Sequence, residues 1–315
     1  MSNPTVSQVH INQPLSNVLV GYFQEQPSAL RAVFPPVSVK KRSDSYFIWN
    51  KGDLMRSDAA VRAPGNAPVD FNIGISNTSY TCVEYALRYG LVDELESNAD
   101  FNVREPIAKA LGQKLMLRET LLFASTYLVG SVWATDNTLA GATQWSDINS
   151  TPVAAVRLAK RTIKLSTGFM PNVMTMNDAV ADALIEHPDL RGRLAVTQMQ
   201  NIGYDQRASF LGQIFGLEVI ILDQIYNSAV ENQTASMGAA VTDNCLIAYR
   251  STSPAINAPS AGYTFEWSSE SGGSSVKTYR DGDEGKRMDW LEASTYVAPQ
   301  VVATDCGYLF IDVLA

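Results

Sequence analysis

The chain is poor in histidine, and this scarcity bears directly on its chemistry. Its 315 residues include two histidines, so a Ser-His-Asp or Cys-His catalytic site would have to use His10 or His187. His10 lies in a polar N-terminal stretch. His187 precedes a proline at the end of an expected helix, where we expect it to interact with the last helical carbonyls. The sequence therefore gives little support to imidazole-dependent catalysis.

Cysteine pairs and common catalytic motifs are also missing. The three cysteines, Cys82, Cys245 and Cys306, lie far apart and form no CxxC pair, which disfavours a disulfide framework or a zinc site. The patterns GxGxxG, GxxxxGK[ST], HExxH and GxSxG do not occur. Ser38 and Lys41 match SxxK, but they lie in an expected strand without the companion motifs. We interpret that match as a charged edge strand, and expect no catalytic residue, cofactor or metal.

Charge is scarce and its balance is acidic. Charged residues make up 18% of the chain, and 24 Lys+Arg against 32 Asp+Glu give a net charge of -8. Such a chain is a poor candidate for a protein whose main task is to neutralise phosphates. The N-terminus lacks a signal-peptide pattern, and the most apolar window, 121–134, is shorter than the ~20 residues of a membrane span. We expect a soluble protein whose surface is rich in neutral polar residues or is covered by other subunits.

One acidic segment resembles the start of a calcium-binding loop. Residues 281–285 read Asp-Gly-Asp-Glu-Gly, and Glu292 falls at the twelfth position. Lys286, however, stands at the sixth position, where the sharp turn of such a loop needs glycine. We therefore favour a solvated acidic turn over a calcium site.

The first third of the chain reads as extended structure. Residues 1–36 are polar and punctuated by prolines, and only 28–34 could form a short helix. Residues 37–90 carry strand-like runs at 46–49, 69–75 and 80–89, with no helical periodicity between 37 and 75. A long hairpin is marginally stable alone, and its open edges invite pairing with another chain. This region therefore indicates a neighbouring subunit.

The remainder predicts one long helix and at least two sheets. Pro106 fits the first turn of a helix over about 104–130, in which Ile107, Leu111, Leu115 and Leu122 recur at helical spacing. A second helix is expected over 153–165. Residues 171–286 alternate short strands with helices, and the C-terminal residues are rich in strand formers. The fold class is α+β.

Basic residues gather in two places that could contact a partner. Four lie at i, i+3, i+4 and i+7 on the second helix: Arg157, Lys160, Arg161 and Lys164. We favour a solvated face for these four, and keep contact with an acidic partner, for example a neighbouring copy of the chain, as the alternative. The others lie on the extended hairpin: Lys40, Lys41, Arg42, Lys51, Arg56 and Arg62. For the cluster Lys40-Lys41-Arg42 the two interpretations are closer. These ten cations are candidate subunit-interface residues.

The stretch 141–190 resembles a known family. Trp145-Ser146-Asp147 is followed by Thr151-Pro152, a basic helix, the run 167–172 (TGFMPN) and the run 184–188 (LIEHP). In this combination and order, the segment resembles the lambda-like major capsid proteins of tailed bacteriophages, which share the HK97 fold. The order of elements along the rest of the chain fits the same family.

The resemblance implies a domain plan and a function. It implies an N-terminal arm (1–36), an E-loop hairpin with flanking strands (37–90), a P domain with the spine helix (91–170), an A domain (171–286), and C-terminal strands that return to the P domain (287–315). It also implies a structural protein that self-assembles into hexamers and pentamers of an icosahedral shell around double-stranded DNA. The virion capsid, assembled in the host bacterial cytoplasm, would be its location.

Partners and alternatives follow from the same resemblance. Besides copies of itself, the chain would meet portal, scaffolding and decoration proteins, with no sequence-specific DNA binding and no membrane. The nearer alternative is an encapsulin-like compartment shell, which shares the fold but encloses proteins. The more distant one is a soluble hydrolase that uses Ser38 and Lys41.

Overall fold

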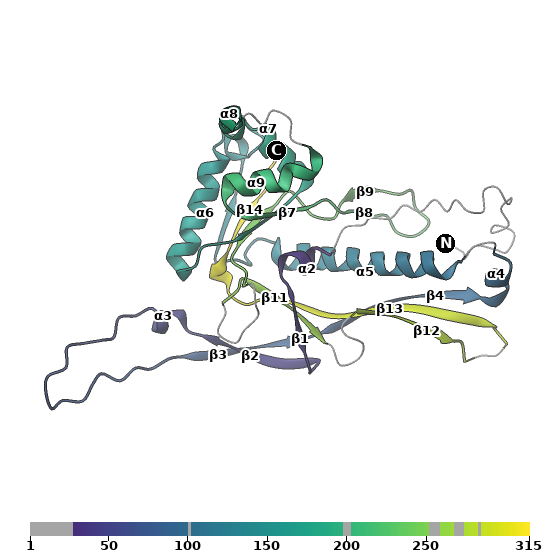
Figure 1. The fold of residues 1–315 in the computed structure, drawn as a ribbon, viewed down its shortest axis with the longest axis horizontal. Helices are drawn as coiled ribbons and strands as arrows, with labels where there is room; N and C mark the ends of the chain where they lie inside the picture. Colours follow the sequence, from purple (N-terminus) through teal and green to yellow (C-terminus); the bar gives the residue numbers. More distant parts are fainter. Residues whose placement is uncertain (1–27, 100–101, 198–202, 252–258, 268–273, 283–284) are drawn as a thin grey trace.

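The computed structural model describes residues 28–99, 102–197, 203–251, 259–267, 274–282 and 285–315. Figure 1 shows a molecule with two main bodies: a long sheet with a helix along it, and a second, helix-covered sheet above one end of that layer. A thin hairpin extends from the side below the second sheet. The mixture of helices and sheets agrees with the α+β class predicted from the sequence.

The long sheet is built around one strand. It contains β1 (Pro36–Val39), β4 (Val83–Val92), β11 (Gly262–Trp267), β12 (Ser274–Arg280) and β13 (Met288–Val301). The strand β13 pairs with β11 and β12, and also runs antiparallel to β4 from Val297↔Val83 to Met288↔Val92. After the short helix α4 (Asp93–Ser97), helix α5 (Arg104–Tyr127) lies along this sheet and confirms the long helix predicted from apolar spacing.

The packing between helix and sheet follows the predicted spacing. Leu111 and Leu115 of α5 are buried against Leu91 of β4 and Leu291 of β13. These positions lie four residues apart on α5, so their side chains project from one face of the helix. Helix α5 therefore stabilises the long sheet through a continuous apolar contact.

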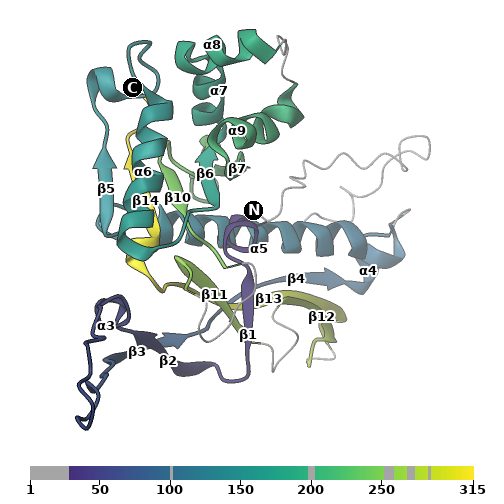
Figure 2. The same cartoon turned by 60° about the vertical axis from the view of Figure 1, so that its left-hand side comes forward.

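The second sheet supports a layer of helices. It has the order β5-β14-β10-β6-β7. Its strands are β5 (Thr135–Thr138), β6 (Val173–Asn177), β7 (Glu218–Leu222), β10 (Cys245–Ala248) and β14 (Gly307–Ile311). Helices α6 (Pro152–Thr167), α7 (Asp178–Glu186), α8 (Pro188–Thr197) and α9 (Arg207–Phe215) accompany it, as Figure 2 shows.

Two cores hold the second sheet in place. Side chains of α6, α7 and α9 share one core with alternate residues of the strands, such as Met174 and Ile247. The neighbouring residues Val173 and Leu246 point the other way and join α2 (Ala29–Val33) and the end of α5 in a second core. The helix α2 confirms the short helix expected at 28–34, and it rests on α5 of the same chain.

Helix α6 begins and ends where its sequence signals predict. Pro152 occupies its first turn, where the missing amide hydrogen costs nothing. Gly168 follows the helix with φ 80°, the left-handed conformation that glycine adopts without steric penalty. The expected helix at 153–165 is therefore confirmed, with both ends extended by one or two residues.

The hairpin differs from the expectation in two respects. Its strands are β2 (Ser43–Trp49) and β3 (Ile75–Thr81), so the strand expected at 69–75 is wrong: residues 69–74 have no partner strand because β2 ends at Trp49. A one-turn helix, α3 (Lys51–Leu54), also lies where no helix was expected. The Asn50 side chain accepts a hydrogen bond from the Gly52 amide, which caps this turn.

Strand pairing crosses the domain division drawn from the sequence. Strands β11 and β12, within 171–286, pair with β13 in the long sheet, whereas β14, within 287–315, pairs with β5 and β10. The remaining short elements are β8 (Ile225–Asn227), β9 (Met237–Ala239), η1 (Gly141–Thr143), η2 (Tyr204–Gln206) and η3 (Thr304–Cys306). The division itself stays a prediction.

Candidate subunit-interface surfaces

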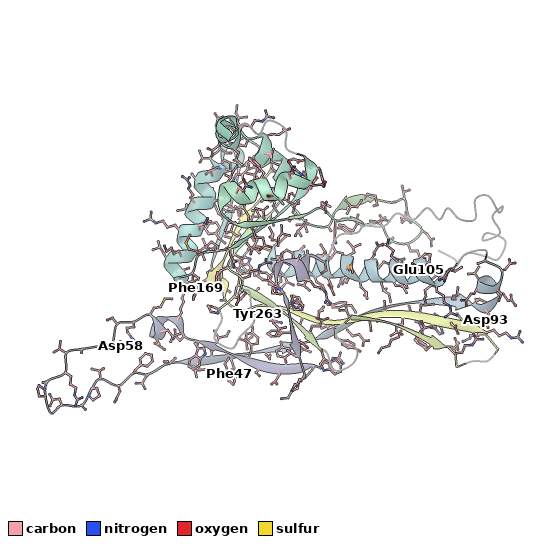
Figure 3. All side chains as sticks on the ribbon, in the orientation of Figure 1. Phe47, Asp58, Asp93, Glu105, Phe169 and Tyr263 are labelled. Atoms are coloured by element: carbon pink, nitrogen blue, oxygen red, sulfur yellow. The ribbon has the colours of Figure 1, made fainter. Side chains whose placement is uncertain are left out.

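The hairpin is tied at its base and open beyond it. The Asn50 amide donates to the Gly74 carbonyl at 3.0 Å, and Asp53 Oδ2 accepts from the Gly74 amide at 2.9 Å. Arg56 pairs with Asp53 and Asp58, each at 3.0 Å. Beyond these contacts the chain runs away from the molecule, with Asp58 on the outgoing limb (Figure 3). The hairpin therefore projects as an anchored but uncovered element.

The hairpin base is also attached to the body of the molecule. Lys51 forms an ion pair with Asp305 of η3. The Met55 side chain lies close to Gly168 at the end of α6, since a Cβ atom added to this glycine would lie 3.7 Å from Met55 Cε. The Ser166 hydroxyl of α6 in turn donates to the Asp305 carbonyl at 3.3 Å. The base of the hairpin thus lies against the lower end of α6 and against η3.

An apolar face along the hairpin is left exposed by the residues that the structure describes. The β2–β3 register pairs Trp49 with Ile75 and Phe47 with Asn77, so Phe47, Trp49 and Ile75 project from the same side of the ribbon. Their exposed fractions are 68%, 40% and 56%, and Figure 3 shows Phe47 on the uncovered ribbon. The sequence predicted the strand at 46–49 but did not single out these three residues. Further exposed apolar side chains follow along the hairpin: Leu54, Met55, Val61, Val69 and Phe71.

The cations at 40–42 have separate local roles. Lys41 pairs with Asp44 at 3.0 Å. Arg42 Nε donates to the Cys82 carbonyl at 3.1 Å, which braces the start of the hairpin. The Lys40 carbonyl accepts from Trp267 Nε1 at 3.1 Å. The three residues therefore do not form one basic site.

The SxxK alternative finds no chemical support in this arrangement. The hydrogen bond and charge of Asp44 raise the pKa of Lys41. A lysine that activates a serine needs the opposite, a lowered pKa and a neutral amine. The contact with Asp44 therefore favours the protonated amine, which works against a role of Lys41 as the base that activates a serine.

The cations of α6 line one open groove of about 450 Å³ between α6 and α9. Its walls include all four predicted residues, Arg157, Lys160, Arg161 and Lys164, and the end of α9 at Phe215 and Gly216. Lys160 Nζ donates to the Phe215 carbonyl at 2.7 Å. Burial, and to a lesser degree the charge of Arg157, lower the pKa of Lys160. Arg157, Arg161 and Lys164 are exposed, in line with a solvated face, and the stripe forms one wall of a solvent-open groove.

Of the remaining predicted cations, Lys51 and Arg56 take part in the hairpin contacts above. Arg62 Nε donates to the Asn66 carbonyl at 2.5 Å and so stays within the outer hairpin. The ten predicted residues thus fall into three groups, at the start of the hairpin, along it, and on α6. The structure does not bring these groups together in one site.

His187 has different partners from those expected. Its ring is buried, with Nε2 3.0 Å from Ser150 Oγ and 3.0 Å from the Asp147 carbonyl. Nδ1 accepts from the Asp189 amide at 3.1 Å, in the first turn of α8. The expected contact with the last carbonyls of α7 is therefore wrong: the imidazole caps the following helix and braces the turn before α6.

Three further observations concern ions and membranes. Within the described ranges, no three His, Cys, Asp and Glu side chains gather closely enough to hold a metal ion. In the segment that resembles a calcium loop, Asp281 accepts from Trp290 Nε1 at 2.8 Å, and Asp283 and Glu284 lie outside the described residues. No helix in the part of the chain that the structure describes is long and apolar enough to cross a membrane.

Comparison with known proteins shows that the chain is similar to phage capsid proteins. No family model matches the chain. The major capsid protein of Burkholderia phage BcepMu is 22% identical to it over 317 residues, which cover 96% of this chain and 97% of the relative. The hydrolase and compartment-shell alternatives gain no support from this relative or from the structures below.

Solved structures show the same fold over nearly the whole chain. A phage-related protein of Bordetella bronchiseptica RB50 matches with a TM-score of 0.70 and 20% identity, covering 96% of this chain and 97% of its own. The capsid structure of cyanophage P-SCSP1u matches with a TM-score of 0.59 and 11% identity, covering 98% of both chains. The predicted resemblance is thus confirmed: the chain has the HK97-like fold and is similar to phage major capsid proteins along almost its entire length.

Proposed function

We propose that this chain is the major capsid protein of a tailed bacteriophage, a structural subunit that assembles with copies of itself into a closed shell. The observation that carries the proposal is the anchored hairpin with an uncovered apolar face. A two-stranded ribbon of this kind gains little stability alone, and a contiguous exposed apolar surface marks an interaction site. A shell of identical subunits supplies a neighbour for every such hairpin.

The finer features of the proposal follow from the fold family. The subunits form hexamers and pentamers of an icosahedral shell that encloses double-stranded DNA, assembled in the host bacterial cytoplasm. Portal, scaffolding and decoration proteins are its further partners. The net charge of -8 suits a container that does not grip its genome strongly, because few phosphates are neutralised by such a chain.

Electron microscopy of the purified recombinant protein, paired with light scattering for mass, tests the proposal. Closed shells, or rings of five and six subunits, are the expected result. The contents of particles recovered from infected or induced cells separate the proposal from a compartment shell: DNA with a portal supports it, and an enclosed enzyme contradicts it. A protein that stays monomeric when supplied with its own scaffolding protein would also contradict it.

A further inference from the structure

The groove between α6 and α9 carries positive charge without a counter-ion among the described residues. No carboxylate of the described residues lies within ion-pair distance of its four cations, Arg157, Lys160, Arg161 and Lys164, although the chain as a whole has a net charge of -8. The Lys160 ammonium group donates a hydrogen bond to the neutral Phe215 carbonyl. Since like charges at such spacing repel one another, an anionic partner would stabilise this surface.

An acidic stripe with matching spacing lies on the neighbouring helix α7. Asp178, Asp182 and Glu186 follow one another at i and i+4 steps and are at least partly exposed. Arg207 pairs with Asp178 and Asp182, while the Asp182 side chain stays 59% exposed. Asp223 approaches the same cluster through the Tyr204 hydroxyl at 3.4 Å. One buried guanidinium therefore faces several carboxylates, and the surface remains negative.

The helix α9 keeps the two charged surfaces apart within one subunit. Its first residue, Arg207, contacts the aspartates of α7, and its last, Phe215, contacts Lys160 of α6. These nine residues span about 12 Å at 1.5 Å per residue. Figure 2 shows α6 and α7 as separate columns with α9 beside them. Asp178 and Asp182 therefore lie at the opposite end of α9 from the Lys160 contact, and we take the carboxylates for the groove from another copy.

The dimensions of the two stripes agree. The cations extend over eight residues of α6, about 10.5 Å from first to last, and the carboxylates extend over all nine residues of α7, about 12 Å. Leu158 and Leu165 flank the cations and are 59% and 75% exposed, so apolar area is also available for burial at this contact. We propose that the α6–α9 groove of one subunit receives the α7 carboxylate stripe of a neighbouring copy.

This inference rests on the proposed function, because it needs subunits that surround one another. The contact is heterologous: one surface of each copy meets a different surface of the next. Repetition of such a contact closes a ring when the rotation allows it. The electrostatic complementarity would orient neighbours and exclude wrong registers before the apolar surfaces are buried.

Zero-length crosslinking tests the contact directly. Isotope-labelled and unlabelled protein are mixed, assembled and treated with a carbodiimide, which joins amines to carboxylates that touch. Mass spectrometry is expected to find mixed-label peptides that join Lys160 or Lys164 to Asp182 or Glu186. Assembled particles in which these lysines join only other carboxylates, or remain unlinked, would overturn the inference.

Charge reversal provides the second test, with assembly measured by sedimentation and microscopy. Lys164→Glu and Glu186→Lys are each expected to raise the concentration for half-assembly by about tenfold, and their combination is expected to restore assembly. Lys114→Glu on α5 is the matched control, an exposed helical lysine with the same charge change. Circular dichroism confirms that each variant folds.

The outcomes separate this inference from the proposed function. Wild-type protein that assembles while Lys164→Glu assembles equally well contradicts the inference alone. Wild-type protein that does not assemble even when supplied with its own scaffolding protein contradicts both. If Lys164→Glu leaves assembly unchanged but weakens a salt-dependent affinity for DNA, the groove binds phosphates, and the proposed contact with α7 is wrong.

Discussion

Arg31 of α2 forms a two-pronged ion pair with Glu119 of α5: Nε lies 2.9 Å from Oε2, and Nη2 lies 3.0 Å from Oε1. Nη2 also lies 3.1 Å from Glu266 of β11, and both carboxylates are almost completely buried. One guanidinium therefore connects helix α2 both to helix α5 and to the long sheet. Its carboxylate partners together raise the pKa of Arg31 well above its usual range, against the effect of burial.

Removal of this guanidinium should be costly. Arg31→Met leaves the buried Glu119 and Glu266 carboxylates without their cation, and we expect a loss of about 3 kcal/mol in the free energy of unfolding. Chemical denaturation measures it. Lys41→Met removes an exposed pair with Asp44 and is the control, expected to change stability little. An equal loss in the free energy of unfolding for the two substitutions would contradict a large contribution of the Arg31 ion pairs to stability.

His187 should act as a structural brace rather than as a catalyst. His187→Phe keeps a ring of similar size but leaves the Ser150 hydroxyl and the Asp189 amide without their partner, and we expect a loss of about 2 kcal/mol. Ser150→Ala removes one hydrogen bond and should cost about 1 kcal/mol. Thermal unfolding measures both losses. A His187→Phe protein with wild-type stability would contradict the hydrogen-bonding arrangement described above.

Acid should loosen the far end of the long sheet first. Arg104 binds Glu96 and Asp289, and Arg280 binds Asp93 and Asp289. These arginine contacts lower the pKa values of all three carboxyl groups.

The sign of the pH effect follows from the lowered pKa values. A carboxyl group with a lowered folded-state pKa stabilises the native state above its unfolded pKa, which is about 4, and loses that contribution as the pH falls through the folded value. The protection of amide hydrogens against exchange at the β12–β13 end should therefore fall below about pH 4 before that of α6. Uniform exchange of both regions, or slower exchange at the β12–β13 end, would contradict this assignment.

Deletion of Lys51–Ala67 should separate folding from assembly. None of these residues is buried, so the melting temperature should change by no more than a few degrees. The variant should stay soluble and fail to build closed shells, because it lacks most of the projecting hairpin. Sedimentation and microscopy measure assembly. As a control, a variant with a similar deletion in the exposed turn between β8 and β9 should keep its melting temperature and its assembly. Normal shells from the hairpin deletion would refute the role of the hairpin.

Much of the fold can be predicted from local patterns in the sequence. Pro106 and the apolar spacing of Leu111 and Leu115 were enough to predict α5, and Pro152 with Gly168 bounded α6. Both predictions depend on neighbours within a few turns of the same helix. The strand expected at 69–75 failed because extended residues without a partner have the same composition as a strand.

The interface surfaces were harder to predict, because their parts are distant in sequence. The stripe on α6 was visible from its spacing, but the other wall of the groove comes from Phe215, 55 residues after Lys160. Glu119 follows Arg31 by 88 residues, and Ser150 precedes His187 by 37. Such contacts are set by the packing of whole layers, which no local pattern in one sequence specifies.

The attachment of the hairpin at Asp305 has a mechanical consequence. The turn η3 that carries Asp305 joins β13 of the long sheet to β14 of the second sheet, and Lys51 fixes the hairpin to this same turn. The hairpin is thus linked to the turn between the two bodies, and a change in the angle between these bodies would also change the direction in which the hairpin reaches. A subunit that flexes to suit a more sharply curved part of a lattice would redirect its own reach toward the next subunit by the same motion.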